Sequence, residues 1–268
     1  MKNLKRLKNR LFGLPPHPYE KQFSLEMDLA EVNWPSKFLL IASTPRCGSH
    51  LLGHMLMDQG EYGVPLEYLN QSNFPYWYRR LKSKDPKSMF EELVPKRTSP
   101  TGNFTLKAHW HQYTLFENKI NTLTKNVGIS DIIWIYRRSI LKQAISLAIA
   151  EQTQAWISGT PELQPAVYSF SHIESAATRI NNENSQWKEY LSSREAENVF
   201  CICYEDLTST QGDGLARLNR HLNCNPDVKL TSRTKPQTQN RNIDWAIRFK
   251  SELKKEQEWI LEDAVWNI

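Results

Sequence analysis

The sequence predicts an α/β protein built on a mostly parallel sheet that is flanked by helices on both faces. Two observations lead to this class. Short apolar segments alternate along the chain with amphipathic helical segments, an order that is typical of parallel sheets. The first apolar segment, residues 37–43, also passes directly into a glycine-containing turn and then into a helical pattern.

Four segments are predicted to be strands because each is short, rich in β-branched or aromatic residues, and bounded by turn or polar residues. They are residues 37–43, 103–109, 131–137 and 198–205. In a parallel sheet, ligands bind at the carboxyl ends of the strands. The residues that follow these segments are therefore candidates for a functional site.

Helical patterns separate the predicted strands. Apolar residues at positions 141, 144, 145, 148 and 149 fall on one helical face. Three further segments are predicted to be helices: residues 172–192, 214–223 and 244–262. The two long connections, residues 70–102 and 155–171, contain prolines among aromatic and polar residues and are predicted to be loops that wall a substrate site.

The length of 268 residues suits one large α/β domain. Residues 37–268 are predicted to form this single domain, and residues 1–36 a basic N-terminal extension. The extension has no apolar core of a secretory signal, and no apolar stretch reaches the 18 residues of a membrane span. Its basic residues suit a solvated tail, or contact with a membrane surface or nucleic acid.

Charge and cysteine content narrow the functional classes. The net charge of +5 suits an anionic ligand and does not require nucleic acid as a partner. The four cysteines show no C-x-x-C pairing, and Cys201 and Cys203 share one face of a predicted strand, as core residues do. This pattern is typical of a reducing compartment, so we expect a cytoplasmic protein.

The turn after the first predicted strand, "STPRCGSH" at residues 43–50, has the composition of an anion-binding loop. The first N–H groups of the following helix lack intrahelical partners and carry the positive end of the helix dipole. Gly48 allows close backbone approach, Arg46 adds a positive charge, and Ser49 and His50 offer side-chain donors. These features predict a phosphate or sulfate site, although an ordinary strand-to-helix turn has the same outline. The missing Walker lysine argues against Mg-ATP.

A second cationic site follows the third predicted strand. Arg137 and Arg138 lie at its end, and Ser146 lies nine and eight residues further on, in the next predicted helix. A guanidinium group and a hydroxyl in this arrangement would bind a second phosphate.

Four motifs, in their order and spacing, resemble the bacterial carbohydrate sulfotransferases typified by trehalose 2-sulfotransferase: "TPRCGSHLL", "GVPLEYL", "FTLKAHWHQ" and "YRRSILKQAISLAIAEQTQAW". The resemblance covers residues 38–156 and continues more weakly through "CYEDL" and "KPQTQNRNIDW". It implies a P-loop-like sulfotransferase fold and the sulfuryl donor 3′-phosphoadenosine 5′-phosphosulfate (PAPS). It further implies a carbohydrate or glycolipid hydroxyl as acceptor, no metal, and leaves a homodimer open.

The resemblance also assigns the donor-binding residues. The 5′-phosphosulfate of PAPS would be bound by the loop residues Arg46, Cys47, Gly48, Ser49 and His50. The 3′-phosphate would be bound by Ser146 and one arginine. Arg137 matches the family position, whereas Arg138 has the eight-residue spacing to Ser146 that is common in sulfotransferases.

Glu67, in "GVPLEYL", lies at the position of the family's catalytic base. Burial at the rim of the sheet is expected to raise its pKa toward neutrality and let it deprotonate the acceptor hydroxyl. Lys107 matches a family lysine and would stabilise charge on the bridging oxygen, as Arg46 would, or hold the acceptor. Val64 replaces an acidic residue of the trehalose enzyme, which argues against trehalose itself as the acceptor.

Other chemistry is less well supported by the sequence. His50 with His54, and His109 with His111, have metal-ligand spacing, but no further ligand completes a site. Cys47 beside His50 lacks the third group that would orient a thiol nucleophile. The alternatives of another class are a non-catalytic binder of a phosphorylated nucleotide or a sulfated glycan on the same fold, and a kinase-like transferase.

Overall fold

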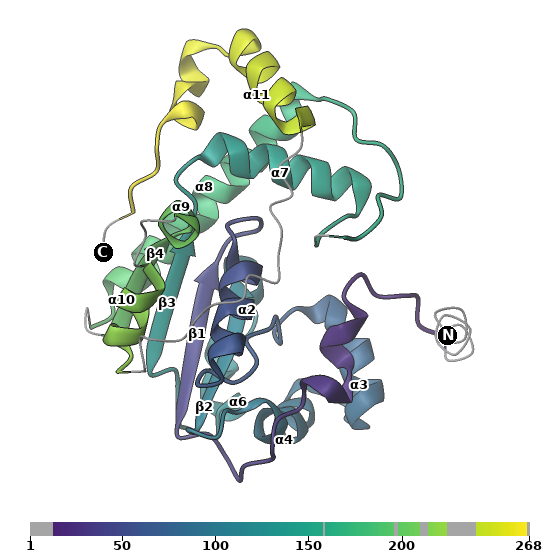
Figure 1. The fold of residues 1–268 in the computed structure, drawn as a ribbon, viewed down its shortest axis with the longest axis vertical. Coiled ribbons are helices and arrows are strands. Elements are labelled where there is room, and N and C mark those ends of the chain that lie inside the picture. Colours follow the sequence, from purple (N-terminus) through teal and green to yellow (C-terminus); the bar gives the residue numbers. More distant parts are fainter. Residues whose placement is uncertain (1–12, 158, 196–197, 210–213, 224–239, 267–268) are drawn as a thin grey trace.

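A computed structural model of the chain describes residues 13–157, 159–195, 198–209, 214–223 and 240–266. Its centre is a parallel four-stranded sheet in the order β2-β1-β3-β4 (Figure 1). The strands are β1 (Lys37–Ser43), β2 (Asn103–His109), β3 (Asp131–Tyr136) and β4 (Val199–Cys203). The four predicted strands are thus confirmed, and their ends shift by two residues or fewer.

Helices cover both faces of the sheet. Successive residues of a strand point to opposite faces, and in β1 the residues on both faces are apolar and need to be buried. Phe38 and Leu40 of β1 face one core, which is closed by α3 (Phe74–Leu81), α4 (Pro86–Arg97), α5 (Trp110–Thr114), α6 (Ile120–Leu123) and α8 (Phe170–Ser192). Leu39 and Ile41 face the other core, closed by α2 (Ser49–Gln59) and α10 (Gly214–His221). The predicted fold class is confirmed.

A third apolar cluster lies beyond the carboxyl ends of the strands. There α7 (Ile140–Thr153) and α8 pack with α11 (Asn240–Glu252), at the top of Figure 1. A short α9 (Tyr204–Thr208) follows β4, and 3₁₀ segments occur at η1 (Glu20–Phe23), η2 (Leu25–Met27), η3 (Gln71–Asn73), η4 (Glu117–Lys119) and η6 (Lys255–Leu261).

Two predictions about secondary structure were wrong. Residues 70–102 are not a loop, because they contain the helices α3 and α4. Asp85 caps α4 by accepting a hydrogen bond from the backbone N–H of Ser88 at 2.9 Å, and Pro86 occupies the first helical position. An Asp-Pro pair there is a helix start signal. The helix predicted for residues 244–262 also ends early, at Glu252, and buried Ile260 reaches the core from the separate segment η6.

The segment before β1 packs against the core. Met27 is buried, and Phe23 packs edge-on against the buried ring of Trp77, with ring centroids 4.8 Å apart. Asp28 forms an ion pair with the fully buried Arg97, whose Nε donates to Oδ1 at 2.9 Å, and a second ion pair with Arg80. The described part of the extension is therefore tied to α3 and α4.

Replacing Asp28 with alanine is expected to destabilise the fold by about 3 kcal/mol, since removal of one partner leaves a buried charge without compensation. Chemical denaturation monitored by circular dichroism measures this change. Glu31→Ala is the matched control, because Glu31 is exposed and its Lys96 partner lies 3.7 Å away. This control should change stability by less than about 0.5 kcal/mol. Equal stability of the two variants would contradict a structural role for Asp28.

Candidate functional site

The predicted site residues lie along one rim of the sheet, at the carboxyl ends of its strands. The chain leaves β1 toward β2 and leaves β3 toward β4, so the two central strands carry their connections in opposite directions. The crevice between two such strands is where open α/β sheets bind ligands. Arg46 follows β1 and Arg137 follows β3, so the two predicted cationic sites meet at this crevice.

The loop between β1 and α2, residues 43–50, has an unusual backbone. Arg46 has a φ of 66° and Gly48 a φ of 96°. A Cβ at Gly48 would lie 2.2 Å from the ring of Tyr204, so this position accepts only glycine without rearrangement. A left-handed residue other than glycine is strained, and such residues cluster at ligand sites. We call residues 43–50 the anion loop, after its predicted ligand.

Buried side chains from distant elements hold the anion loop in place. Gln143 of α7 is fully buried, and its Nε2 donates to Thr44 Oγ1 at 2.9 Å and to the Pro45 carbonyl at 2.7 Å. Trp187 of α8 donates from Nε1 to the Ser43 carbonyl at 2.9 Å. These three hydrogen bonds fix the position of the loop backbone without a ligand, and such preorganisation strengthens electrostatic binding. Neither contact could be recognised from the sequence.

The variant Gly48→Ala should lose about 1–3 kcal/mol of stability from backbone strain, and more from the clash with Tyr204. Gly60→Ala is the matched control, because Gly60 also has a positive φ, of 77°, but no atom lies within 4 Å of the place that a Cβ would take there. The melting temperature of Gly48→Ala is therefore expected to fall further than that of Gly60→Ala. Equal melting temperatures would show that the Tyr204 ring does not restrict the side chain at position 48.

Arg46 turns toward α7 and brings the two predicted anion sites together. Its Nε donates to Ser146 Oγ at 3.0 Å, and its guanidinium group also donates to the carbonyl of Trp156. Burial, together with the nearby positive charge of Arg137, lowers the pKa of Arg46 to about 10. Two guanidinium groups that repel each other in a buried place favour binding of an anion between them.

Arg137 and Arg138 differ sharply in their surroundings. The Arg137 guanidinium group lies 5.1 Å from the centre of the Tyr204 ring, and its Nε lies 3.7 Å from a carboxylate oxygen of Glu205. Among the described residues, this buried Nε makes no hydrogen bond. Arg138 is more exposed and forms an ion pair with Asp206 at 2.8 Å. Arg137 thus retains hydrogen-bonding capacity at the crevice, whereas Arg138 is committed to Asp206.

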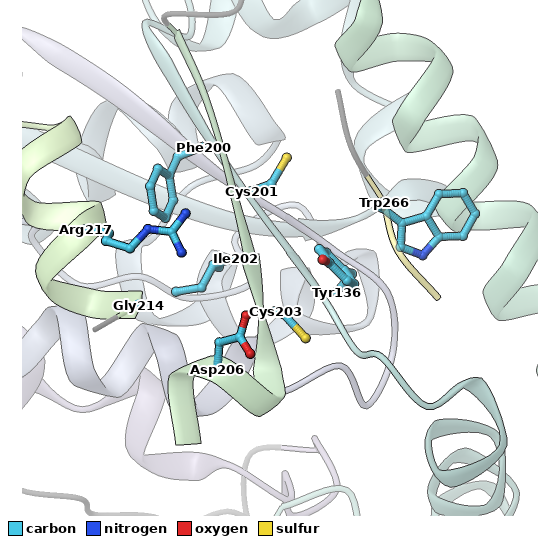
Figure 2. Close-up of a pocket in the computed structure, with 9 residues that line it drawn as sticks. All are labelled: Tyr136, Phe200, Cys201, Ile202, Cys203, Asp206, Gly214, Arg217 and Trp266. Carbon is cyan, nitrogen blue, oxygen red and sulfur yellow. The ribbon is translucent and has the colours of Figure 1, made fainter. Parts of the chain in front are cut away.

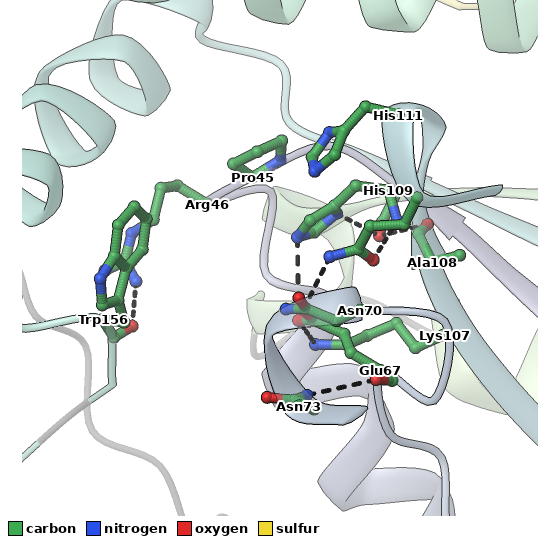
Figure 3. A network of polar contacts seen from close by, with 12 residues as sticks. Pro45, Arg46, Glu67, Asn70, Asn73, Lys107, Ala108, His109, His111 and Trp156 are labelled. Carbon is green, nitrogen blue, oxygen red and sulfur yellow. Dashed lines mark hydrogen bonds and ion pairs between the residues drawn. The ribbon is translucent and has the colours of Figure 1, made fainter. Parts of the chain in front are cut away.

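Glu67 lies at the other end of the rim, beside β2. Leu66 pairs with Leu106 of β2, and this bridge aligns the next residue with the strand end. Figure 3 shows the polar network around the Glu67 carboxylate. Its Oε1 pairs with Lys107 Nζ at 2.8 Å, and its Oε2 accepts from Asn70 at 3.0 Å and from Gln112 at 3.1 Å. Two of the three predicted catalytic residues, Glu67 and Lys107, are therefore in direct contact.

The expected rise in the pKa of Glu67 was wrong in direction. Burial alone would raise the pKa, but the Lys107 ammonium, the His109 ring and the hydrogen bonds from Lys107 and Gln112 outweigh it. The pKa of Glu67 therefore lies well below its usual range, and the group is a carboxylate at neutral pH.

His109 lies beside Glu67, as Lys107 does. The sequence indicated His109 only as a possible metal ligand together with His111. Ser43 Oγ donates to the Ala108 carbonyl at 3.0 Å, so it accepts from His109 Nδ1 at 2.9 Å. With the proton assigned to Nδ1 by this network, the lone pair of Nε2 faces Glu67 Oε1 at 3.8 Å. Burial lowers the pKa of His109, which keeps the ring neutral.

The remaining predicted residues also lie at the loop. Cys47 is fully buried, and burial raises the pKa of its thiol, which makes it a poor nucleophile. Burial and the nearby Lys107 lower the pKa of His50 to about 3, so that this ring is neutral. In the part of the chain that the structure describes, no cluster of three or more His, Cys, Asp or Glu side chains could hold a metal. Val64 is buried in the core.

A separate pocket lies on the edge strand β4 (Figure 2). Its walls include Tyr136, Cys203, Asp206, Arg217 and Trp266. None of the predicted catalytic or binding residues lines it. The pocket therefore lies beside the β3 and β4 end of the rim and does not include Arg46, Arg137 or Glu67.

A parallel α/β sheet with a glycine-containing loop and a helix N-terminus at its switch point is typical of proteins that bind phosphorylated ligands. Comparison with known proteins is more specific. Residues 38–252 match the model of the Stf0 sulphotransferase family, and the chain belongs to this family. The resemblance found in the motifs is thereby confirmed.

Individual relatives are distant. The chain is 22% identical to trehalose 2-sulfotransferase of Mycolicibacterium smegmatis, over 83% of this chain and 97% of that one. It is also 22% identical to trehalose 2-sulfotransferase of Mycobacterium tuberculosis, over 80% and 94% of the two chains. Among solved structures, the sulfotransferase domain from the curacin biosynthetic pathway is similar, with a TM-score of 0.47, 18% identity and coverage of 85% and 97%.

Within the residues that the structure describes, no helix is long and apolar enough to cross a membrane.

Proposed function

We propose that this protein transfers a sulfuryl group from PAPS to a hydroxyl group of a carbohydrate or glycolipid. The observation that carries the proposal is the order of charged groups along one rim. Two guanidinium groups lie at β3 and β1, the anion loop lies next to them, and a carboxylate with its lysine lies at β2. This order matches a donor with two phosphate-like groups that meets an acceptor at the far end of the loop.

The residues at the crevice fit the donor. Arg137, whose buried Nε makes no hydrogen bond to a described residue, and Ser146 would hold the 3′-phosphate. Arg46 contacts Ser146 and begins in the anion loop, so it would bridge the two anionic groups of the donor. The backbone N–H groups at the start of α2 and the side chain of Ser49 would hold the 5′-phosphosulfate.

The residues at β2 fit the acceptor side of the reaction. PAPS supplies the sulfuryl group, and transfer of such groups resembles phosphoryl transfer in having a loose transition state. Glu67 would orient the acceptor hydroxyl and take its proton as the new S–O bond forms. The S–O bond to the phosphate oxygen of the donor would break in the same step, and adenosine 3′,5′-bisphosphate would leave. Lys107 keeps Glu67 ionised and fixes its carboxylate, and the neutral His109 adds a second acceptor for hydrogen bonds beside it. Rate enhancement would come mainly from this positioning.

The location and assembly of the protein stay predictions. The described cysteines Cys47, Cys201 and Cys203 are free thiols, which suits the proposed cytoplasmic location. Whether the protein is a homodimer is a prediction from family resemblance alone.

Adenosine 3′,5′-bisphosphate, the product of the donor, is expected to raise the melting temperature. At 100 times its dissociation constant a ligand adds roughly 2.7 kcal/mol of stability, which corresponds to roughly 5–10 °C for a domain of this size. Adenosine 5′-phosphate is the matched control, since it lacks the 3′-phosphate, and its shift should be much smaller. Equal shifts, or none, would overturn the donor assignment.

A transfer assay then separates an enzyme from a binder. Labelled PAPS is offered with a panel of saccharides and glycolipids, and sulfated product is separated by mass. Product formation that depends on the acceptor is the expected result. A protein that binds the bisphosphate but sulfates no member of a broad hydroxyl panel would instead be a non-catalytic nucleotide binder.

A further inference from the structure

The segment that precedes η2 contacts both sides of the proposed transfer centre. We call residues 13–23, which end with η1, the N-terminal brace. Its His17 contacts Asn73 in residues 66–73, which we call the Glu67 turn. Its Tyr19 contacts His54 of α2, the helix that follows the anion loop. His17 and Tyr19 are only two residues apart in the chain, so one short segment contacts both α2 and the Glu67 turn.

The first contact is a chain of hydrogen bonds from His17 to Glu67. The backbone N–H of Tyr19 donates to His17 Nδ1 at 3.0 Å, so the ring proton is assigned to Nε2. That Nε2 donates to Asn73 Oδ1 at 2.9 Å. Asn73 is 3% exposed, and its Nδ2 donates onward to the backbone carbonyl of Glu67 at 3.3 Å. The three hydrogen bonds are therefore compatible with one another: each ring nitrogen and each amide atom acts as a donor or as an acceptor, and none has to act as both.

The His17 ring is itself held in one orientation. The ring of Phe23 and the ring of Tyr76 both meet it edge-on, each with centroids 5.0 Å away. Tyr76 donates from its hydroxyl to the Pro15 carbonyl at 2.9 Å, which closes the brace over α3. Burial lowers the pKa of His17, so the ring carries the single proton that the hydrogen bonds require at neutral pH. A fixed ring transmits position better than a solvated one.

The second contact runs from Tyr19 to the first turn of α2. The Tyr19 hydroxyl lies 3.3 Å from His54 Nε2, and His54 Nε2 lies 3.1 Å from His50 Nε2. The Tyr19 ring also packs edge-on against the His50 ring, with centroids 5.2 Å apart. His50 is the second residue of α2, so this contact supports the helix start on which the anion loop ends.

We propose that the N-terminal brace is a positioning element of the transfer centre, with His17 fixing the Glu67 turn through Asn73 and Tyr19 fixing His50 through His54. The effect on turnover rests on the proposed function, but the coupling of the brace to the Glu67 turn does not. The brace touches none of the side chains to which the proposed function assigns a chemical step. Its role is to hold the carboxylate and the anion loop at a constant separation.

The test uses His17→Ala and His17→Gln in the full-length protein. Glutamine can place its amide nitrogen where His17 Nε2 lies and so keep the donor to Asn73, whereas alanine removes it. Met27→Ala is the control for simple destabilisation, because Met27 lies outside the brace, in the adjacent η2, and is buried in the core. Hydrogen exchange of peptides that cover residues 66–73 reports on the Glu67 turn without any assay of activity.

His17→Ala is expected to speed exchange in residues 66–73 and to lower kcat about tenfold, with an unchanged KM for the donor, since small misplacements of a catalytic group cost this much or more. His17→Gln should remain near wild type in both measurements. Met27→Ala should lower the melting temperature, and its kcat should equal the wild-type value at temperatures where the variant is folded.

Several outcomes would overturn the proposal. Wild-type exchange at residues 66–73 in His17→Ala would show that the brace does not hold the turn. A His17→Gln variant as impaired as His17→Ala would show that the hydrogen bond to Asn73 is not the connection. If the wild-type protein sulfates no acceptor, the proposed function fails, and the exchange measurement still decides whether the brace positions the turn.

Discussion

Glu67→Gln is expected to lower turnover by about 10²–10⁴-fold, the usual contribution of general-base catalysis. Glutamine has the size of glutamate but cannot take a proton. The affinity for adenosine 3′,5′-bisphosphate should barely change, because Glu67 lies at the β2 end of the rim and the predicted 3′-phosphate site lies at β3. Turnover at saturating PAPS and acceptor measures the first quantity, and the ligand-induced shift in melting temperature measures the second.

The substitution Glu67→Gln also removes the ion pair with Lys107, which lowers stability. A matched variant controls for this effect. Glu151→Gln removes a carboxylate of similar exposure, 24% against 23%, which pairs with His172 and Arg179 instead. This control should keep its turnover. A folded Glu67→Gln protein with near-wild-type turnover on its acceptor would remove Glu67 as the base and leave His109 as the nearby alternative.

The pH profile follows from the direction of the pKa shift of Glu67. Its lowered folded-state pKa means that the carboxylate is already ionised above the ordinary value of 4.5, and the active form is lost only as the pH falls through the lower folded value. The acid limb of kcat/KM, which reports groups of the free enzyme, should therefore lie below pH 4.5. A limb centred between pH 6 and 7 would contradict this assignment.

Arg137→Ala is expected to weaken the binding of adenosine 3′,5′-bisphosphate by about 30-fold or more, because truncating one partner of a buried charge pair costs about 2–5 kcal/mol. Arg138→Ala is the matched control, since Arg138 forms its ion pair with Asp206 at 2.8 Å. Its affinity should stay within about threefold, as expected for an exposed pair. Calorimetric titration of both variants measures the difference.

The binding of adenosine 5′-phosphate provides a further check. Because this ligand lacks the 3′-phosphate, Arg137→Ala should weaken it far less than it weakens the bisphosphate. A stronger effect of Arg138→Ala than of Arg137→Ala would exchange the two assignments. Equal losses for both nucleotides would place Arg137 outside the 3′-phosphate site.

The parts of the site that depend only on residues close together in the chain could be predicted from the sequence. The anion loop could be predicted because a short buried strand, a turn with Gly48 and an apolar helical face follow one another directly. The helices α3 and α4 were missed because Pro75, Pro86 and Pro95 suggested loops, although Pro86 follows the capping residue Asp85 and so starts a helix.

The protonation of the site could not be predicted in this way. Glu67 and Lys107 are forty residues apart, and only the bridge between Leu66 and Leu106 makes them an ion pair. The sequence indicated burial, which raises a carboxyl pKa, but not the charges and donors that lower it. The choice between Arg137 and Arg138 likewise depends on Tyr204, Glu205 and Asp206, which belong to α9, directly after β4.

The sequence alone determined the fold class, the strands, the anion loop and the family, because periodicity and motif order are local properties of the chain. Only the tertiary structure decided which charged groups meet. It paired Glu67 with Lys107, joined Arg46 to Ser146, and tied His17 through Asn73 to the Glu67 turn. The strength and even the sign of an electrostatic effect depend on distance and burial, and both are set by contacts between residues far apart in the sequence.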